Sequence, residues 1–411
     1  MKRVVVPFAA FFCVLCGYFV LRPVRDEIGV RAGVEKLPWL FTGTFIATLL
    51  LVPLFGWIVS RVPRRVIAGA TYALCAAALL LTYAGLQNGG NLIAWGAGLF
   101  IGISVLNLFL ISVFWSLMAD SYDEADARKT YGIIAAGGTA GAIAGPSITA
   151  ILAPLVGPMN LLPISAGFLV LAALLTTAIP RRADAPPQQK LGGSVFAGIR
   201  LALQSPTLLR IALIILCYTS ISTILYFEQA DIVKKTIADS GARTRFFALL
   251  DLTNNIITVL TQALITSRVL TRFGLKTALT AAPALIGTGL AALAVFPRLG
   301  LIAVLQVIHR VGEHGFTRPG REVIYTVVEP EARYKAKNFL DTFVYRGNDA
   351  LMAWLIGLLH TAGAGIGSIA TIGIAIAGGW AANGYALGRN HDRDTKRRES
   401  EPEPDPDPLP A

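Results

Sequence analysis

Long apolar runs separated by short polar stretches dominate this sequence. Twelve runs reach about 18 residues or more, enough for a helix to cross the ~30 Å hydrocarbon core of a bilayer. The runs are rich in Leu, Ala, Ile and Gly and lack the alternation of a membrane β-strand, so we predict α-helices. The predicted spans are 4–21, 39–60, 66–86, 92–118, 131–155, 159–179, 207–227, 246–266, 277–296, 299–317, 338–361 and 364–386.

The runs form two sets of six, and the second set repeats landmarks of the first. EADAR (124–128) recurs as EPEAR (329–333), 205 residues later, and Asp26 falls on Asp231 at the same offset. A basic turn follows the second run in each set. Two parallel six-helix halves related by an axis along the membrane normal are typical of major-facilitator carriers. We therefore predict an all-α integral membrane protein of twelve helices with this architecture.

The same pattern predicts the domain boundaries. Residues 1–180 form an N-terminal six-helix bundle and residues 207–388 a C-terminal one. The Pro, Gly and polar residues of 181–206 predict a cytoplasmic linker between them. Residues 389–411 are basic and then acidic with several prolines, which predicts a disordered cytoplasmic tail.

Composition supports the membrane assignment. Of the 411 residues 54% are hydrophobic and 15% are charged, against ~25% charged in ordinary soluble domains. The net charge of +11 could suggest nucleic-acid binding, but most of the 36 Lys and Arg residues fall in short segments on the side of the N-terminus. This bias fits the positive-inside rule. We expect a multi-pass protein of the inner (cytoplasmic) membrane with both termini in the cytoplasm, and no nucleic-acid partner.

Polar residues inside the predicted spans are the most informative, because a charge at bilayer depth costs at least ~2.5 kcal/mol. Four predicted helices carry such residues on one face at helical spacing. Since lipid would reject these faces, we expect them to converge on a shared interior cavity. They are Arg22 and Arg25, with Asp26, in the first helix; Asp251, Asn254 or Asn255, Thr258 and Gln262 in the eighth; Arg310, His314, Arg318 and Arg321, with Glu313 beside them, in the tenth; and Asn338, Asp341, Tyr345 and Asp349, with Arg346 adjacent, in the eleventh.

Each face also has a simpler explanation. Arg22 and Arg25 could lie at the outer membrane interface, and Arg318 and Arg321 could be ordinary charges at a cytoplasmic helix end. The Asp251 face could be a hydrogen-bonded seam between helices. The sequence leaves these alternatives open.

Motifs for catalysis, metal binding or cofactor binding are missing from the sequence. We find no hydrolase triad, no HExxH and no Walker motif. Gly137, Gly141 and Gly145 lie inside a span at four-residue spacing, which predicts a close-packing face and not a phosphate loop. Cys13 and Cys16 have the spacing of a CxxC motif without further ligands nearby. We therefore expect no enzyme activity, no metal and no cofactor.

Several short blocks resemble the ATP/ADP translocase family of plastids and intracellular bacteria. RPVRD (22–26) resembles that family's RDTKD, FWSLMAD (114–120) its FWGFAN, and ARKTYGIIAAGG (127–138) its AKRFYxLFGxGAN. FTRPGREVIY (316–325) is similar to FDPxKEMAY, and YKAKNFLD (334–341) to VKGKAAID. The blocks span both halves of the chain and follow the order that they have in the family.

The resemblance implies a cavity that binds nucleotide phosphates and exchanges ATP for ADP by alternating access. It implies functional roles for six residues: Arg22, Arg25, Asp26, Arg321, Glu322 and Asp341. The chain departs from the family at Asp120, where the family has Asn, and at Pro23, which replaces an acidic residue. Arg318 is an added basic residue.

We predict a transporter for an anionic, phosphorylated nucleotide-type substrate such as ATP, ADP or phosphate, acting as a monomer in the bilayer. The alternative is a proton-coupled major-facilitator permease for another small organic solute. The substrate-binding candidates are Arg22, Arg25, Arg310, His314, Arg318, Arg321, Asp251, Asn255, Tyr345 and Arg346. The charge partners are Asp26, Glu313, Glu322 and Asp341.

Overall fold

The computed structural model describes residues 2–59, 61–179, 203, 205–326, 336–337 and 339–400, and all regular elements within them are helices. The first half contains α1 (Lys2–Ala32), α2 (Leu37–Val59), α3 (Arg64–Gln87), α4 (Leu92–Ser121), α5 (Glu124–Val156), the short turn η1 (Pro158–Asn160) and α6 (Leu161–Thr177).

The second half has the same plan with three helices interrupted. A π-helical turn, in which a backbone turn takes up an extra residue, occurs in η2, η3 and η4. The elements are α8 (Pro206–Thr236), α9 (Ser240–Thr261), η2 (Gln262–Thr266), α10 (Ser267–Val295), α11 (Leu299–Gly312), η3 (Glu313–Thr317), α12 (Arg318–Tyr325), η4 (Phe339–Val344), α14 (Tyr345–Thr361) and α15 (Ile366–Ser400). The all-helical fold is confirmed, and each predicted span falls on one of these helices or helical rods.

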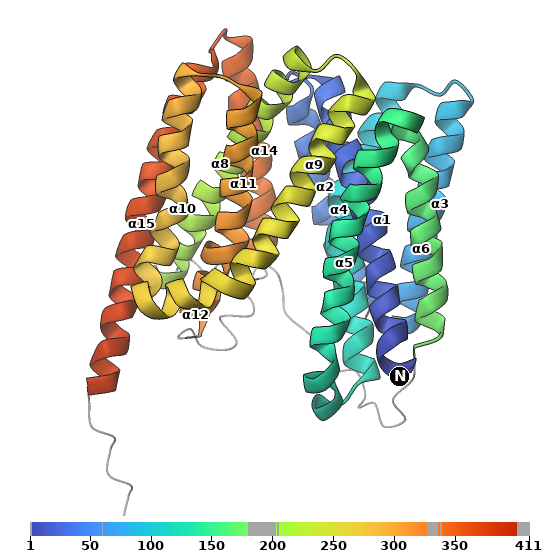
Figure 1. Cartoon of the computed structure of the whole chain (residues 1–411), viewed down its shortest axis with the longest axis horizontal. Helices are drawn as coiled ribbons and strands as arrows, with labels where there is room; N and C mark the ends of the chain where they lie inside the picture. The colour runs from blue at the N-terminus through green and yellow to red at the C-terminus, as the bar shows by residue number, and fades with distance from the viewer. Residues whose placement is uncertain are drawn as a thin grey trace, which may run out of the picture.

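The helix boundaries show the same internal repeat as the sequence motifs, at additional positions. α5 ends at Val156 and α14 at Thr361, while α6 begins at Leu161 and α15 at Ile366, so both pairs are offset by the predicted 205 residues. Figure 1 shows two groups of helices, α1–α6 (blue to green) and α8–α15 (lime to red). The two halves therefore form two bundles of the same design.

The two bundles approach each other at one end only. We call the end where α1 begins, at Lys2, the inner end, and the end where it finishes, at Ala32, the outer end. In Figure 1 the bundles lie together at the outer end and apart at the inner end, where the N-terminus is marked.

Within the first bundle, α5 packs closely against α1 through its glycines. A Cβ atom at Gly137, Gly141 or Gly145 would collide with the backbone carbonyl oxygens of α1, for example that of Phe8. The predicted close-packing face is therefore confirmed, and it fixes the helix that carries Arg22 against a rigid neighbour.

Two predicted boundaries differ from the structure. α1 continues to Ala32, eleven residues beyond the predicted end at residue 21, because its charged residues are shielded by the second bundle and the helix has not left the protein there. α15 runs to Ser400, so residues 389–400 are helical where we expected a disordered tail to begin. Residues 181–202 of the predicted linker, the EPEAR segment, Asn338 and residues 401–411 lie outside the described residues.

Nine helical segments in the described part of the chain are long and apolar enough to span a membrane, and one of them, Ser240–Val295, contains both α9 and α10. α1 alone has 31 residues, a length of roughly 46 Å at ~1.5 Å per residue, which exceeds the ~30 Å hydrocarbon core. The fold is that of a multi-pass membrane protein.

Candidate functional site

A cavity of about 460 Å³ lies between the two bundles. Helices α1, α2 and α4 line it from one side, and α8, α9, α11, η3, α12 and α14 line it from the other. Eight of the ten predicted substrate-binding residues line this cavity; Asp251 and Arg321 do not. The polar and aromatic lining is Tyr18, Phe19, Arg22, Arg25, Phe41, Thr44, Phe100, Ser104, Asn107, Tyr218, Ser222, Thr223, Tyr226, Asn254, Asn255, Thr258, Gln306, Arg310, His314, Arg318, Tyr345, Arg346 and Asp349.

One buried carboxylate holds two of the arginines. Asp251 is 1% exposed, and its Oδ1 lies 2.5 Å from Nη1 of Arg310 and 3.4 Å from Nη1 of Arg22. Arg22 comes from α1 and Arg310 from α11, so this ion pair joins the bundles. The other oxygen, Oδ2, has no hydrogen-bond partner within the described part of the chain. Asp251 is therefore a counter-ion behind the cavity wall, shared between two arginines that face the cavity.

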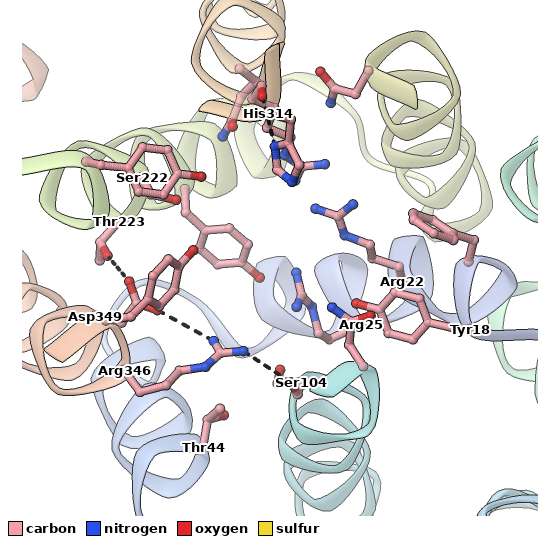
Figure 2. A pocket seen from close by; sticks show the side chains of 18 of the residues that line it. Tyr18, Arg22, Arg25, Thr44, Ser104, Ser222, Thr223, His314, Arg346 and Asp349 are labelled. Carbon is pink, nitrogen blue, oxygen red and sulfur yellow. Dashed lines mark hydrogen bonds and ion pairs between the residues drawn. The ribbon is translucent and has the colours of Figure 1, made fainter. Parts of the chain in front are cut away.

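Arg25 lies one turn further along α1 than Arg22. Its Nη2 is 2.5 Å from Oδ1 of Asp26, and its guanidinium lies 5.6 Å from the centre of the Phe100 ring on α4. The adjacent carboxylate and the aromatic face hold the guanidinium at the cavity wall. Figure 2 shows Arg22 and Arg25 extending from the same helix into the cavity.

Arg346 and Asp349 form the polar wall contributed by α14. Nη1 of Arg346 lies 3.5 Å from Oδ2 of Asp349, and Thr223 on α8 donates a 3.3 Å hydrogen bond to Oδ1 of that carboxylate. Arg346 also donates to the carbonyl of Ser104 on α4, at 3.3 Å (Figure 2). This wall therefore makes a second connection between the bundles.

The π-helical turn η3 sets the direction of His314 and Arg318. The ring Nδ1 of His314 lies 3.0 Å from the carbonyl oxygen of Arg310, and the ring faces the cavity. Two side chains of η2 bind the η3 carbonyls, since Gln262 donates to His314 at 2.9 Å and Thr266 to Gly315 at 2.7 Å. Gln262, which we expected on the cavity face, therefore stabilises this turn.

Arg321 and Glu322 lie outside the cavity. Arg321 is 8% exposed and pairs with Glu313 at 2.9 Å and with Asp341 at 3.4 Å. Glu322 pairs with Lys337 at 2.6 Å, and both side chains are exposed. Arg321, Glu313 and Asp341 thus form a charge cluster that joins η3, α12 and η4 behind the site.

The charges facing the cavity are not balanced. Five arginines line it (Arg22, Arg25, Arg310, Arg318 and Arg346). Three carboxylates contact them, those of Asp26, Asp251 and Asp349. Arg318 has no ion-pair partner among the described residues. Counted over the described residues, the wall therefore carries an excess of two positive charges, which favours a negatively charged ligand.

Sequence reasoning missed the aromatic part of the lining. Tyr18 and Phe19 on α1, Phe41 on α2, and Tyr218 and Tyr226 on α8 all border the cavity. Spacing offered one signal, because Tyr18 lies four residues before Arg22 on the same helical face. Aromatic residues are common in membrane helices, so this signal was too weak to select them.

Polar contacts between the bundles close the outer end. Glu27 on α1 binds Arg243 on α9 through two hydrogen bonds, of 2.6 and 2.9 Å, and the indole nitrogen of Trp354 on α14 donates to Thr42 on α2 at 2.9 Å. Among the described residues, no hydrogen bond or ion pair joins the bundles nearer the inner end than the cavity itself. The cavity is thus closed toward the outer end.

A membrane fold whose two six-helix bundles enclose a polar, charged cavity defines a solute transporter. Residues 7–233 match the Major Facilitator Superfamily, and because this match covers more than half of the chain, the chain belongs to that superfamily. The comparison with curated proteins found no match.

Solved transporter structures show the same fold at low sequence identity. A crystal structure of the nucleoside transporter NupG matches with 14% identity and a TM-score of 0.66, covering 94% of this chain and 97% of that one. A bacterial homologue of the iron transporter ferroportin, in an inward-facing state, has 13% identity and a TM-score of 0.67, covering 94% and 98%. A bacterial homologue of the lysosomal transporter Spinster, also inward-facing, has 15% identity and a TM-score of 0.61, covering 95% and 97%.

Proposed function

We propose that this transporter carries an anionic, phosphorylated solute of the nucleotide type and exchanges it across the membrane, as in an ATP/ADP antiport. The observation that carries this proposal is the set of five cavity arginines with an excess of two positive charges. A guanidinium binds phosphate through two parallel hydrogen bonds, which makes arginine the preferred residue for phosphate recognition.

The rest of the lining suits the remainder of a nucleotide. The cavity volume of about 460 Å³ lies within the ~300–1,000 Å³ range of small-molecule sites. Tyr226, Phe41 and Phe100 offer aromatic faces beside Arg25, where a planar base could stack. The amide N and O atoms of Asn254 have no hydrogen-bond partner among the described residues, and they are available to polar groups on a base or sugar.

Asp251 suggests why transport would be an exchange. Without substrate, it holds Arg22 and Arg310 together across the bundle interface. A phosphate group that binds both arginines competes with this carboxylate and releases the link between the bundles. We propose that the bundles then rock about the cavity and that the empty carrier, with its arginines held by Asp251, reorients slowly.

The candidate residues divide into four roles: substrate contact, counter-ion, positioning and surface. We assign substrate contact to Arg22, Arg25, Arg310, His314, Arg318 and Arg346, together with Asn255 and Tyr345. Asp26 and Asp251 are their counter-ions. Arg321 is a positioning residue that holds η3 through Glu313 and Asp341, and Glu322 is a surface residue.

The positive-inside bias supports a location in the inner (cytoplasmic) membrane with both termini in the cytoplasm. In that orientation the end of the cavity toward the N-terminus faces the cytoplasm, and the structure corresponds to an inward-facing state. We propose that the functional unit is a monomer, since one chain provides both walls of the cavity.

Reconstitution into liposomes tests the proposed function. Purified chain is given labelled ATP outside, with ADP, AMP, phosphate or buffer alone loaded inside. We expect uptake that depends on an internal nucleotide or phosphate and fails with buffer alone. Uptake that ignores every internal anion, or no uptake of any nucleotide, contradicts exchange or the substrate class respectively.

The second candidate is a proton-coupled permease for a neutral solute. The observation in its favour is Asp349, a carboxylate that lines the cavity between Arg346 and Thr223 and could carry a proton. In the liposomes given labelled ATP, this permease would show no uptake. Given its own labelled solute, it would lose uptake when a protonophore removes the proton gradient and would need no internal substrate, so the two candidates give opposite results.

A further inference from the structure

A second cavity, of about 580 Å³, lies on the outer surface of the first bundle, away from the bundle interface. Helices α2, α3 and α4 line it. Several lining leucines are open to the surroundings, with Leu54 48% and Leu74 69% exposed. In a membrane this surface meets lipid, so the cavity is a groove open to the bilayer. We call it the α2–α4 groove.

The lining of the α2–α4 groove is apolar. It contains Leu, Ile, Val, Phe, Ala and Gly side chains, with Cys75 and two threonines. One of the threonines, Thr82, already donates its hydroxyl proton to the carbonyl of Ala78 at 2.8 Å. A polar solute would find almost no hydrogen-bond partners here, whereas a hydrocarbon chain needs none and would pack against the apolar side chains. The glycines Gly98 and Gly102 on α4 leave open space where side chains would stand.

The groove has the length of one membrane leaflet. Along α2 it runs from Ala47 to Ile58, a rise of eleven residue steps or roughly 16 Å of helix, against about 15 Å for half of the hydrocarbon core. Its inner end, at Ile58, therefore lies near the headgroups of the leaflet on the N-terminal side.

The positively charged side chain of Arg61 lies at that inner end. Arg61 follows Ile58 by three residues, and its guanidinium lies 4.3 Å from the centre of the Trp57 ring. Tryptophan is enriched at the level of the lipid headgroups. The neighbouring Arg64 is neutralised by Asp120 at 2.5 Å, but no carboxylate in the described part of the chain pairs with Arg61.

We propose that the α2–α4 groove is a binding site for an anionic phospholipid, with one acyl chain in the groove and the phosphate on Arg61. The apolar lining selects a hydrocarbon chain, and the length matches a single leaflet. The guanidinium of Arg61, which pairs with no carboxylate among the described residues, supplies the complementary charge at the correct end. This site is independent of the substrate cavity and of the proposed substrate.

Fluorescence quenching of Trp57 tests the proposal. The chain is reconstituted in vesicles containing increasing fractions of phosphatidylglycerol or phosphatidylcholine, each brominated on chain carbons near the ester. The Trp57 signal is obtained by subtracting the emission of Trp57→Phe. We expect half-quenching at a mole fraction of the anionic lipid roughly five-fold lower than that of the zwitterionic lipid, the effect of about one headgroup–arginine contact.

Two variants separate the headgroup from the chain. Arg61→Gln should remove the preference for the anionic lipid, while Arg298→Gln, which changes another arginine beside an aromatic ring, should keep it. Gly102→Leu fills the groove and should weaken quenching by both lipids; Gly132→Leu, at a glycine outside the groove with equally open space, should not.

Three results would overturn the proposal. Equal quenching by the two lipids would mean that ordinary bulk lipid fills the groove. A preference that survives Arg61→Gln would place the headgroup elsewhere. Quenching by neither lipid would mean that a protein surface, such as a second copy of this chain, covers the groove.

Discussion

Helix α1 and the rod formed by α11, η3 and α12 face each other across the cavity, and both carry basic residues at helical spacing. On the unbroken α1, Arg22 and Arg25 both line the cavity. On the rod, Arg310 and Arg318 do so, but Arg321 is turned into the protein against Glu313. The same kind of sequence pattern therefore has two outcomes. The arginines of α1 all face the cavity, whereas those of the rod are divided between the cavity and a buried ion pair.

The π-helical turn η3 explains the difference. In a regular helix with about 100° between residues, Arg321 would lie only about 20° from Arg310, eleven positions earlier, on the same face. The segment Glu313–Thr317 is π-helical and holds more residues per turn than an α-helix. The side chains after it therefore point in different directions around the helix axis from those of an unbroken α-helix. Arg318 is thereby brought toward the cavity and Arg321 is rotated away from it.

The strongest test of this comparison is Arg310→Gln. The change removes a proposed phosphate contact and leaves the buried Asp251 with the more distant Arg22. Loss of such a charge-assisted contact costs ~2–4 kcal/mol, so we expect nucleotide exchange to fall at least ~30-fold. The initial rate of exchange in liposomes measures it. Arg298→Gln is the matched control. If Arg310→Gln exchanges at nearly the rate of the unchanged chain, the rod does not contribute to substrate binding.

Arg321→Met should separate stability from transport. Removing one partner of a buried ion pair leaves Glu313 and Asp341 uncompensated, which costs ~3–5 kcal/mol of stability. We expect a clearly lower melting temperature in detergent, with exchange per folded molecule reduced less than by Arg310→Gln. Adding Glu313→Gln should restore part of the stability. If Arg321→Met melts normally and does not exchange, then Arg321 contacts substrate and the π-turn explanation is wrong.

The membrane fold was predictable from the sequence because the bilayer imposes it. A span must be apolar and about 20 residues long, so the runs that end near Val156 and Thr361 are visible in hydropathy alone. The repeat was visible for the same reason. The end of α1 was not, because charged residues such as Glu27 remain in a helix when another bundle shields them.

The site was predictable only in part. Charges inside spans identified Arg22 and Arg310, since lipid excludes them. Spacing could not show that Asp251 is the counter-ion of both arginines, because this depends on three helices meeting in the fold. Local sequence also gives no warning of the η3 turn. Glu27 and Arg243, 216 residues apart, pair only in the folded chain.

The outer and inner ends of the bundle interface also differ, since the polar links between described residues lie at the cavity and at the outer end. Glu27→Gln should weaken the outer link, because Arg243 then loses its charged partner. With Ser222→Cys as a reporter in the cavity, we expect a membrane-impermeant maleimide added at the outer side to label it several-fold faster.

The control for this test is Arg31→Gln. Arg31 also contacts Glu27, at 3.4 Å, but it lies on the same helix and leaves the pair with Arg243 intact. It should not change the labelling rate. Equal labelling of the Glu27→Gln variant and its parent would show that the contacts of Trp354, with Thr42 and with Trp39, hold the outer end without the Glu27–Arg243 pair.

The smallest effect is expected for Glu322→Gln, which compares the surface of the rod with its two interior roles. Glu322 lies one residue after Arg321, and the family resemblance implies a function for it, but its side chain pairs with Lys337 in an exposed ion pair at 2.6 Å. Exposed pairs contribute ~0–1 kcal/mol because water and salt screen them. We therefore expect the exchange rate to stay within about twofold and the melting temperature to change little. A loss of exchange as large as that of Arg310→Gln would mean that Glu322 contacts the substrate in another state of the carrier. The division of the rod into cavity, buried and surface residues would then hold only for the state in which the outer end is closed.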